Sequence, residues 1–157
     1  MNHSGAEDDP YDLARFVSAQ ERVYERALAE LQSGWKQTHW MWFVFPQLAG
    51  LGSSAMSRRY AISGADEART YLSHPVLGPR LEECCRTLLG LKGRSAVEIF
   101  GATDKLKLRS CATLYGLVSP AGSVFQQVLE KFFQGDGDDA TARLLRNKKD
   151  EKLTSDD

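Results

Sequence analysis

The amino-acid sequence predicts an all-α protein, a single compact domain built of several helices. Apolar residues recur at intervals of three and four along most of the chain, and residues that commonly begin and end helices stand at the edges of these stripes. The chain has 157 residues, 42% hydrophobic and 26% charged, which is typical of one globular domain. We expect this domain to cover residues 9–146, between a disordered N-terminal segment at 1–8 and a disordered charged tail at 147–157.

The first two predicted elements fill the N-terminal third of the chain. A long amphipathic helix begins at Pro10, where Asp9 can cap it, and ends at Gly34. The next stretch, residues 35–47, is here called the aromatic segment and is too apolar to lie on a surface. It forms either a short buried helix that ends near Pro46 or a buried strand, and periodicity does not decide between them. We favour the helix because no strand partner is evident elsewhere.

Helix-start and helix-stop residues divide the rest of the chain, after a glycine-rich loop at residues 48–54. Capping boxes are predicted where a serine is followed three residues later by a glutamate or glutamine, at Ser95 with Glu98 and at Ser123 with Gln126. We expect roughly six to eight helices, each about 10–14 residues or shorter. The later ones cover residues 66–72, 77–89, 95–101, 103–118, 123–135 and 141–145.

Charge and composition exclude several classes of function. The net charge is −1, so the chain has no general field that attracts nucleic acid or an anionic membrane, and any anion site must be local. The longest strongly apolar run, residues 40–45, is far shorter than the roughly 20 residues of a membrane span, and residues 1–9 lack the pattern of a secretion signal. An odd count of three cysteines suggests no disulfide framework. We therefore expect a cytoplasmic protein with no membrane and no nucleic-acid partner, while the oligomeric state is left open.

Motifs for common cofactors and metals are absent from the sequence. There is no P-loop, no dinucleotide G-x-G-x-x-G, no nucleophile elbow and no H-E-x-x-H. Residues 134–139 look superficially like a calcium loop but lack the glycine at position six and the closing glutamate. The histidines are scattered and the cysteines are few, so no zinc site is recognisable. We predict neither a cofactor nor a metal.

The aromatic segment carries the strongest candidate site, because it contains all three tryptophans of the chain. Indoles offer flat faces for stacking, and Lys36, His39 and Gln47 add polar chemistry beside Trp40 and Trp42. A ligand with a flat ring and an anionic group suits such a wall. The alternative is that the aromatic side chains fill the core, with His39 hydrogen-bonded inside. Trp42 is expected to be more deeply buried than Trp35, which stands beside a glycine and a lysine.

Two further clusters hold candidate residues. Asp104 and Lys107 begin a helix after the glycine at 101, where backbone N–H groups can bind an anion, unless this is only a solvated basic face. The second cluster combines Arg58, Arg59 and Tyr60 with His74, and Tyr60 and His74 could serve as acid–base groups. Alternatively, His74 caps a helix and Tyr60 packs in the core.

A carboxylate partner for the aromatic segment must come from elsewhere in the chain, because the segment itself has none. A buried cation or imidazole without a partner loses its hydration at high cost. We therefore expect Lys36, His39 and Gln47 to converge with Asp104 or Lys107 on one cleft. The predicted catalytic residues are His39 and Asp104, and the predicted ligand-binding residues are Lys36, Trp40, Trp42, Gln47, His74 and Lys107.

Four stretches of the sequence resemble the domain-of-unknown-function 1810 family, over a match that runs from about residue 9 to residue 145. They are residues 9–16, 36–47, 71–78 and 99–107, and the His-Trp-Met-Trp-Phe string at 39–43 is the most specific. Thr38 stands where the family pattern has serine, which keeps a hydroxyl in place. The resemblance implies a mainly helical single domain and brings no established activity. Some members carry the label calpastatin, a calpain inhibitor, but that inhibitor resembles a disordered chain with short repeats and this chain does not.

Three functional hypotheses follow from these residues. The leading one is a small-molecule site walled by Trp40 and Trp42 that takes a nucleotide-like or phosphate-bearing ligand. Its enzymatic form is hydrolysis of an N-glycosidic bond in an ADP-ribose-like substrate, with Asp104 or His39 as the acid–base group. The second is an interaction module whose aromatic patch docks a partner helix or peptide, and the third is a structural accessory domain. No nucleophile is evident, so the sequence leaves catalysis and simple binding both open.

Overall fold

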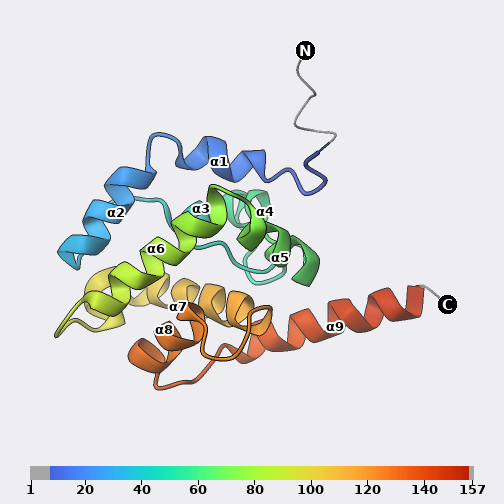
Figure 1. The fold of residues 1–157 in the computed structure, drawn as a ribbon. Coiled ribbons are helices and arrows are strands. Elements are labelled where there is room, and N and C mark those ends of the chain that lie inside the picture. Colours follow the sequence, from blue (N-terminus) through green and yellow to red (C-terminus); the bar gives the residue numbers. More distant parts are fainter. Residues whose placement is uncertain (1–7, 156–157) are drawn as a thin grey trace, which may run out of the picture.

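The computed structural model describes the backbone of residues 8–155 and the side chains of residues 8–148. Within these residues it is all helical, with nine helices and a single isolated bridge between Leu48 and Ile62, which confirms the predicted fold class (Figure 1). The helices are α1 (Ala14–Gln20), α2 (Tyr24–Ser33), α3 (Met41–Val44), α4 (Ala55–Arg59), α5 (Ala65–Ser73), α6 (Leu77–Gly90), α7 (Ala96–Leu117), α8 (Val124–Phe133) and α9 (Asp139–Ser155).

The first predicted helix is in fact two helices, and this prediction is wrong in its continuity. The Asp9 carboxylate does bind backbone N–H groups, those of Leu13 and Ala14 at 2.7 and 2.9 Å, but the helix begins at Ala14 rather than at Pro10. The helix is interrupted after Gln20, because α1 packs on α3 whereas α2 packs on α6. The stop at Gly34 is confirmed, since this residue has the left-handed conformation at the end of α2.

Gln20 shows why the break occurs where it does. Its side chain is 1% exposed and donates to the Phe43 carbonyl at 2.7 Å and to the Tyr71 hydroxyl at 3.2 Å. These bonds fix the end of α1 against α3 and α5. The residues that follow turn away so that α2 can pack on α6, and tertiary packing thus overrides the helical pattern of the sequence.

Helix α7 carries the predicted capping box and a kink. The Ser95 hydroxyl and the Glu98 carboxylate satisfy each other's backbone N–H groups, as expected. Gly101, with φ of 82° and ψ of 170°, interrupts the helix where the sequence predicted a stop, and the helix resumes beyond it. At α8 the Ser123 hydroxyl accepts from Gln126 as predicted, but the Gln126 side chain binds the N–H of Gly122, so the box is closed on one side only.

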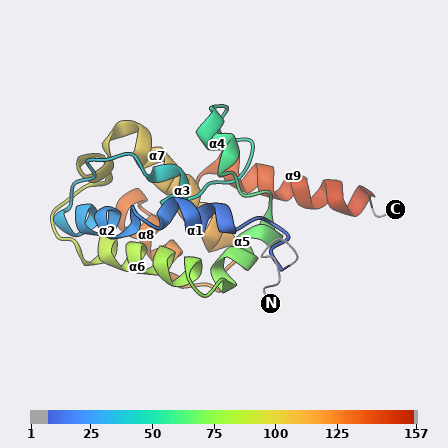
Figure 2. The same cartoon turned by 90° about the horizontal axis from the view of Figure 1, so that it is seen from above.

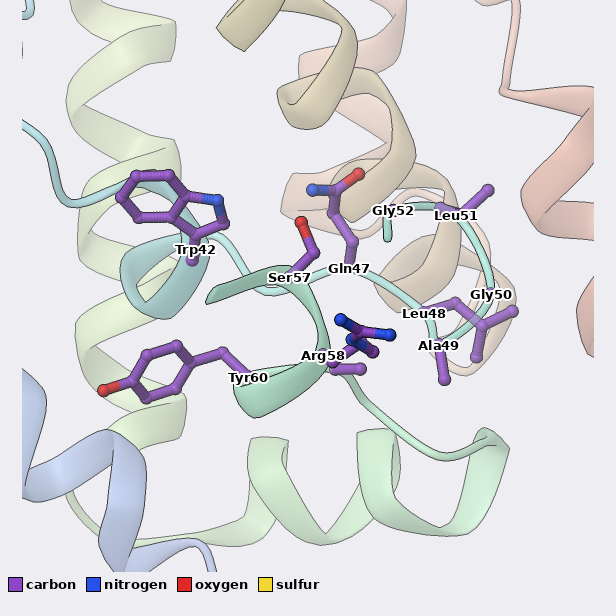
Figure 3. A pocket seen from close by; sticks show the side chains of 11 residues that line it. Trp42, Gln47, Leu48, Ala49, Gly50, Leu51, Gly52, Ser57, Arg58 and Tyr60 are labelled. Carbon is purple, nitrogen blue, oxygen red and sulfur yellow. The ribbon is translucent and has the colours of Figure 1, made fainter. Parts of the chain in front are cut away.

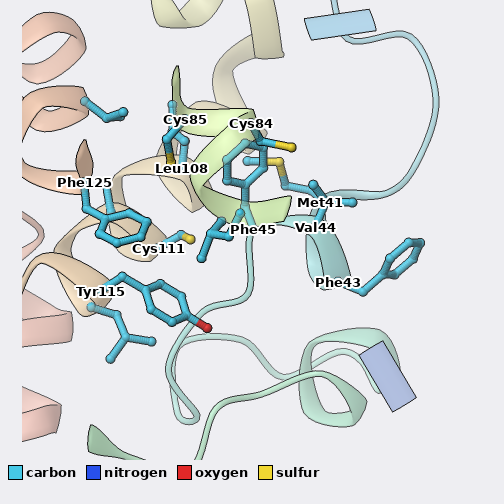
Figure 4. Close-up of a cluster of buried hydrophobic side chains, with 14 of the residues drawn as sticks. Met41, Phe43, Val44, Phe45, Cys84, Cys85, Leu108, Cys111, Tyr115 and Phe125 are labelled. Atoms are coloured by element: carbon cyan, nitrogen blue, oxygen red, sulfur yellow. The ribbon is translucent and has the colours of Figure 1, made fainter. Parts of the chain in front are cut away.

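The core takes buried residues from α1, α2, α3, α5, α6, α7 and α8 and contains the three cysteines. Cys84, Cys85 and Cys111 are buried free thiols among aromatic and aliphatic side chains (Figure 4). Burial raises the pKa of the Cys84 thiol to about 12 and raises those of the other two well above the usual range. A thiol with so high a pKa is a poor nucleophile, so the cysteines serve as small apolar core residues.

The C-terminal helix is longer than the sequence predicted. We expected a short helix at residues 141–145 followed by a disordered tail from 147, whereas α9 keeps a helical backbone to Ser155 and extends beyond the other helices (Figure 2). Disorder of the tail in solution stays a prediction. The predicted disordered segment at 1–8 lies outside the described residues apart from Asp8. In the described residues, no helix combines the length and apolar character that crossing a bilayer requires.

Candidate functional site

A small cavity opens beside Trp42, between α3, the loop that follows it and α4 (Figure 3). Its volume is about 140 Å³. In Figure 3, Ser57 and Gln47 lie between Trp42 on one side and the turn at Gly50–Gly52 on the other. The lining residues are Trp42, Gln47, Leu48, Ala49, Gly50, Leu51, Gly52, Ser57, Arg58, Tyr60 and Ala61.

The turn at residues 50–52, here called the glycine loop, shapes one wall of the cavity. Gly50 has φ of +101°, a conformation that other residues rarely adopt. A Cβ atom on Gly52 would lie 2.6 Å from the Ser57 hydroxyl oxygen, so a side chain does not fit there. The loop therefore packs directly against Ser57 of α4, while its Leu51 is part of the cavity lining.

The polar groups of the cavity are mostly free to bind a ligand. Arg58 is exposed, and it is the one charged side chain in the lining. No carboxylate among the described residues pairs with it, since the ion pairs found there involve other side chains. The Ser54 hydroxyl donates to the Ser57 hydroxyl at 2.9 Å, which leaves the hydrogen of Ser57 available as a donor. Gln47 is half-buried, and its backbone carbonyl accepts from Ile62.

Next to this cavity, two lysines meet on one carboxylate. The ammonium of Lys36 lies 2.8 Å from one oxygen of Asp104, and that of Lys107 lies 3.4 Å from the other. Each lysine also stands 5.0 Å from the centre of an indole ring, Lys36 over Trp40 and Lys107 over Trp42. The structure thus brings four of the predicted ligand-binding residues together around Asp104, one of the two predicted catalytic residues.

The predicted pair of His39 with Asp104 is not formed, and this expectation needs correcting. Both Asp104 oxygens bind lysines, while His39 is exposed and has no hydrogen bond or ion pair among the described residues. The cause is the backbone of Lys36, whose N–H donates to the Ile99 carbonyl at 2.8 Å and so places the lysine beside α7. The cation, and not the imidazole, therefore reaches the carboxylate.

His74 lies apart from this group. Its Nδ1 accepts from the N–H groups of Val76 and Leu77 at 3.1 and 3.2 Å, so the imidazole closes the turn between α5 and α6. This is the capping role that the sequence offered as an alternative to ligand binding. An imidazole nitrogen that accepts two backbone hydrogen bonds has a structural task, and His74 is not among the residues that line the cavity.

The sequence reasoning missed Glu30, a residue of α2 that binds the aromatic segment through hydrogen bonds. Its side chain is buried and accepts four hydrogen bonds, from the backbone of Gln37 and Thr38, the Thr38 hydroxyl and the Trp40 indole, at 2.7–3.0 Å. Burial opposes ionisation, but the hydrogen bonds outweigh it and lower the pKa of Glu30 to about 2. A signal for this role existed, because an acidic residue in the last turn of a helix is unfavourable unless other donors bind it.

The three tryptophans occupy different environments. Trp35 is 57% exposed, Trp40 is fully buried and Trp42 is half-buried at the cavity. The prediction that Trp42 is more deeply buried than Trp35 is confirmed. Only Trp42 offers a ring face to a ligand within a concave site, since Trp40 is enclosed by the protein.

A second, larger hollow of about 790 Å³ lies where the start of α5, the end of α7 and α9 meet. Its two carboxylates are already paired, Asp66 with Arg69 at 3.3 Å and Glu67 with Arg15 at 3.0 Å. None of the predicted site residues lines it. In the part of the chain that the structure describes, no group of histidine, cysteine, aspartate and glutamate is placed to hold a metal ion.

Together these features define an all-helical single-domain protein with a cavity beside its aromatic segment that Trp42 and Arg58 line. The chain belongs to the family described as "Protein of unknown function (DUF1810)", which matches residues 10–145. The fold is also similar to a solved structure, the crystal structure of the conserved hypothetical protein Rv1873 from Mycobacterium tuberculosis. The two chains are 50% identical with a TM-score of 0.86, and the match covers 88% of this chain and 99% of that one. No curated protein matches the chain.

Proposed function

We propose that this protein binds a small ligand with a flat ring and an anionic group, nucleotide-like or phosphate-bearing, in the cavity beside Trp42. The observation that carries the proposal is that Trp42 and Arg58 line the same concave space. An indole face stacks on a planar ring, and a guanidinium without a carboxylate partner binds an anion. Pockets that bind small molecules commonly combine apolar walls with a few convergent polar groups, as this one does.

The lysines around Asp104 support the same proposal by fixing the position of Trp42. Lys107 stands over the Trp42 ring and is itself held by Asp104, which Lys36 anchors from the buried side. A wall that is already held in place loses little conformational entropy when a ligand arrives. The predicted ligand-binding residues Lys36 and Trp40 would then act by positioning Lys107 and Trp42 rather than by touching the ligand.

Binding has more support than the enzymatic form of the proposal, hydrolysis of an N-glycosidic bond in an ADP-ribose-like substrate. A general acid or base needs a free oxygen or nitrogen within hydrogen-bond reach of the reacting atom. Asp104 uses both oxygens on lysines, and His39 does not line the cavity. Catalysis therefore stays a proposal in which neither Asp104 nor His39, the two predicted catalytic residues, has the required position.

The experiment is a thermal-shift series on the full chain with adenosine monophosphate, ADP-ribose and inorganic phosphate. A ligand that binds only the folded state raises the melting temperature, by roughly 5–10 °C at a concentration about 100 times its Kd. We expect the shift with at least one probe, and we expect Trp42→Leu to abolish it. Trp35→Leu is the matched control, because Trp35 lies outside the cavity lining. No shift with any probe, or equal loss in both variants, would contradict the proposal.

The alternative, an interaction module, is favoured by a different tryptophan. Trp35 is 57% exposed, and exposed aromatic residues are enriched where proteins dock partners. A selection of displayed peptides against the protein would test this idea. Binders that Trp35→Ala removes and Trp42→Ala retains would support the module, while a selection that yields none would count against it.

We also propose that the protein acts in the cytoplasm. Cys84, Cys85 and Cys111 are all free thiols in the described structure. Free thiols are typical of a reducing compartment. Imaging of the tagged full chain tests this, and fluorescence confined to any other compartment would contradict it.

A further inference from the structure

We infer that the ligand enclosed by this cavity is a small phosphomonoester with one ring-sized organic group, its phosphate bound by Arg58, Ser57 and the glycine loop. The inference rests on the proposed function, because it assigns a ligand class to the same cavity. Four properties of the cavity lead to it: its volume, its charge, the hydrogen-bonding groups in its lining and the aromatic side chains at one end.

The volume limits the enclosed part of the ligand to a single ring and one anionic group. The cavity measures about 140 Å³, and one water needs roughly 10–15 Å³ of such space. The cavity therefore has room for on the order of ten non-hydrogen atoms. Cavities that enclose drug-sized ligands measure about 300–1,000 Å³. A dinucleotide or an intact ADP-ribose is too large to be enclosed, so only one end of such a molecule would fit.

The charge of the lining selects an anion. Arg58 is the one charged side chain of the lining, and Asp104, the nearby carboxylate, is neutralised by Lys36 and Lys107. A guanidinium presents its N–H groups in a planar fork that matches two oxygens of a phosphate. An anion in this cavity therefore meets attraction from Arg58 without a free carboxylate in the lining to repel it.

The hydrogen-bonding groups near Arg58 include several free donors, which suits a phosphate group whose oxygens are acceptors. No acceptor among the described residues binds the backbone N–H groups of Gly50, Leu51 and Gly52. Ser57 accepts from Ser54 and keeps its own hydroxyl hydrogen for a ligand. Successive free N–H groups in a turn commonly bind anions.

The other end of the cavity accepts the ring. Trp42 and Tyr60 lie on one side in Figure 3, opposite the glycine loop. Leu48 and Ala49 add apolar surface on the side of the glycine loop. A ring stacked on Trp42 would carry its phosphate toward Arg58, and the Gln47 side chain between them could bind a hydroxyl or ring nitrogen.

The test is calorimetric titration of the full chain with four probes: phenyl phosphate, phenol, inorganic phosphate and ADP-ribose. We expect phenyl phosphate, a phosphomonoester with one flat ring, to bind at least tenfold more tightly than phenol or inorganic phosphate. We expect ADP-ribose to bind no more than tenfold more tightly than phenyl phosphate. The Arg58→Gln variant should lose at least tenfold in affinity for phenyl phosphate. Arg26→Gln, a change of an exposed arginine of α2 outside the lining, should change it less than threefold.

The outcomes separate this inference from the proposed function. Equal binding of phenol and phenyl phosphate, or no effect of Arg58→Gln in a variant with the parental melting temperature, overturns the phosphate assignment and leaves a ring-binding site. Inorganic phosphate as tight as phenyl phosphate overturns the ring. ADP-ribose more than tenfold tighter overturns the size limit. Binding of none of the four probes overturns the inference, and the proposed function falls with it only if the thermal-shift series is also negative.

Discussion

Trp40 and Trp42 stand on either side of the start of α3, and each has a lysine 5.0 Å from its ring. They differ in burial and in whether the polar groups around them have hydrogen-bond partners. Trp40 is fully buried, and its indole N–H donates to Glu30 at 2.9 Å within a network whose members all have partners. Trp42 is half-buried, its N–H has no acceptor among the described residues, and it faces a cavity with an unpaired arginine. A saturated network stabilises a fold, whereas unsatisfied donors around a cavity are available to a ligand. The same residue types therefore serve structure on one side and, as we propose, binding on the other.

The largest difference between the two sides should be in stability. Trp40→Ala removes a fully buried indole and one of the four hydrogen bonds to Glu30, so we expect a loss of about 3–5 kcal/mol in the free energy of unfolding. Trp42→Ala should cost about 1–2 kcal/mol, because part of its ring is already in contact with water. Urea unfolding of both variants measures this comparison. Equal losses would show that the structure assigns the wrong tryptophan to the core.

The fall in the free energy of unfolding at acid pH should depend on Glu30. Its pKa is lowered from 4.5 to about 2, so its ionised form stabilises the folded state above pH 4.5, and this contribution is lost as the pH falls toward 2. Each unit of pKa difference between the unfolded and folded states corresponds to about 1.4 kcal/mol. The difference between 4.5 and about 2 therefore predicts a loss of roughly 3 kcal/mol in the free energy of unfolding. Unfolding free energies measured between pH 7 and pH 2 should fall steeply in the parent protein.

The control for this pH dependence is a matched pair of variants. Glu30→Gln should be less stable than the parent at neutral pH and should lack its share of the acid-induced loss. Glu25→Gln, at an exposed position of the same helix, should keep the parental pH profile. An acid limb of unchanged slope in Glu30→Gln would show that other carboxylates produce it.

A smaller effect should distinguish the two lysines on Asp104. The Lys36 side chain is 7% exposed and also donates to the Thr38 carbonyl, whereas Lys107 is 22% exposed with a longer contact to the carboxylate. We expect Lys36→Met to cost about 1–3 kcal/mol and Lys107→Met less than about 1 kcal/mol. If chemical unfolding finds Lys107→Met the more damaging change, the buried anchor of this carboxylate is Lys107 and not Lys36.

The smallest effect should come from the C-terminus. Leu144 and Leu145, in the first half of α9, pack against the core, whereas the sequence beyond Asn147 is mostly charged. Deletion of the residues after Asn147 should leave the melting temperature within about 1 °C, because few apolar groups are lost from the core. A fall of several degrees in a thermal scan would mean that the end of α9 packs in solution.

The sequence by itself determined the local features of this protein. The stop at Gly34, the capping box at Ser95 and the break at Gly101 follow from the conformational preferences and hydrogen bonds of a few neighbouring residues. The all-helical class followed from apolar periodicity in the same way. Such features are predictable because residues close in the sequence decide them.

Only the tertiary structure decided how these elements meet. The break between α1 and α2 depends on the bonds of Gln20 to residues far along the chain, and the role of Glu30 depends on a turn that folds the aromatic segment back over it. The sequence required a distant carboxylate for this segment and named Asp104, but it could not tell whether Lys36 or His39 would reach it. The cavity arises from the side-by-side placement of Trp42, the glycine loop and α4, and Arg58 gains its proposed role from this placement. Contacts across long sequence separations depend on the packing of the whole core, which local preference does not specify.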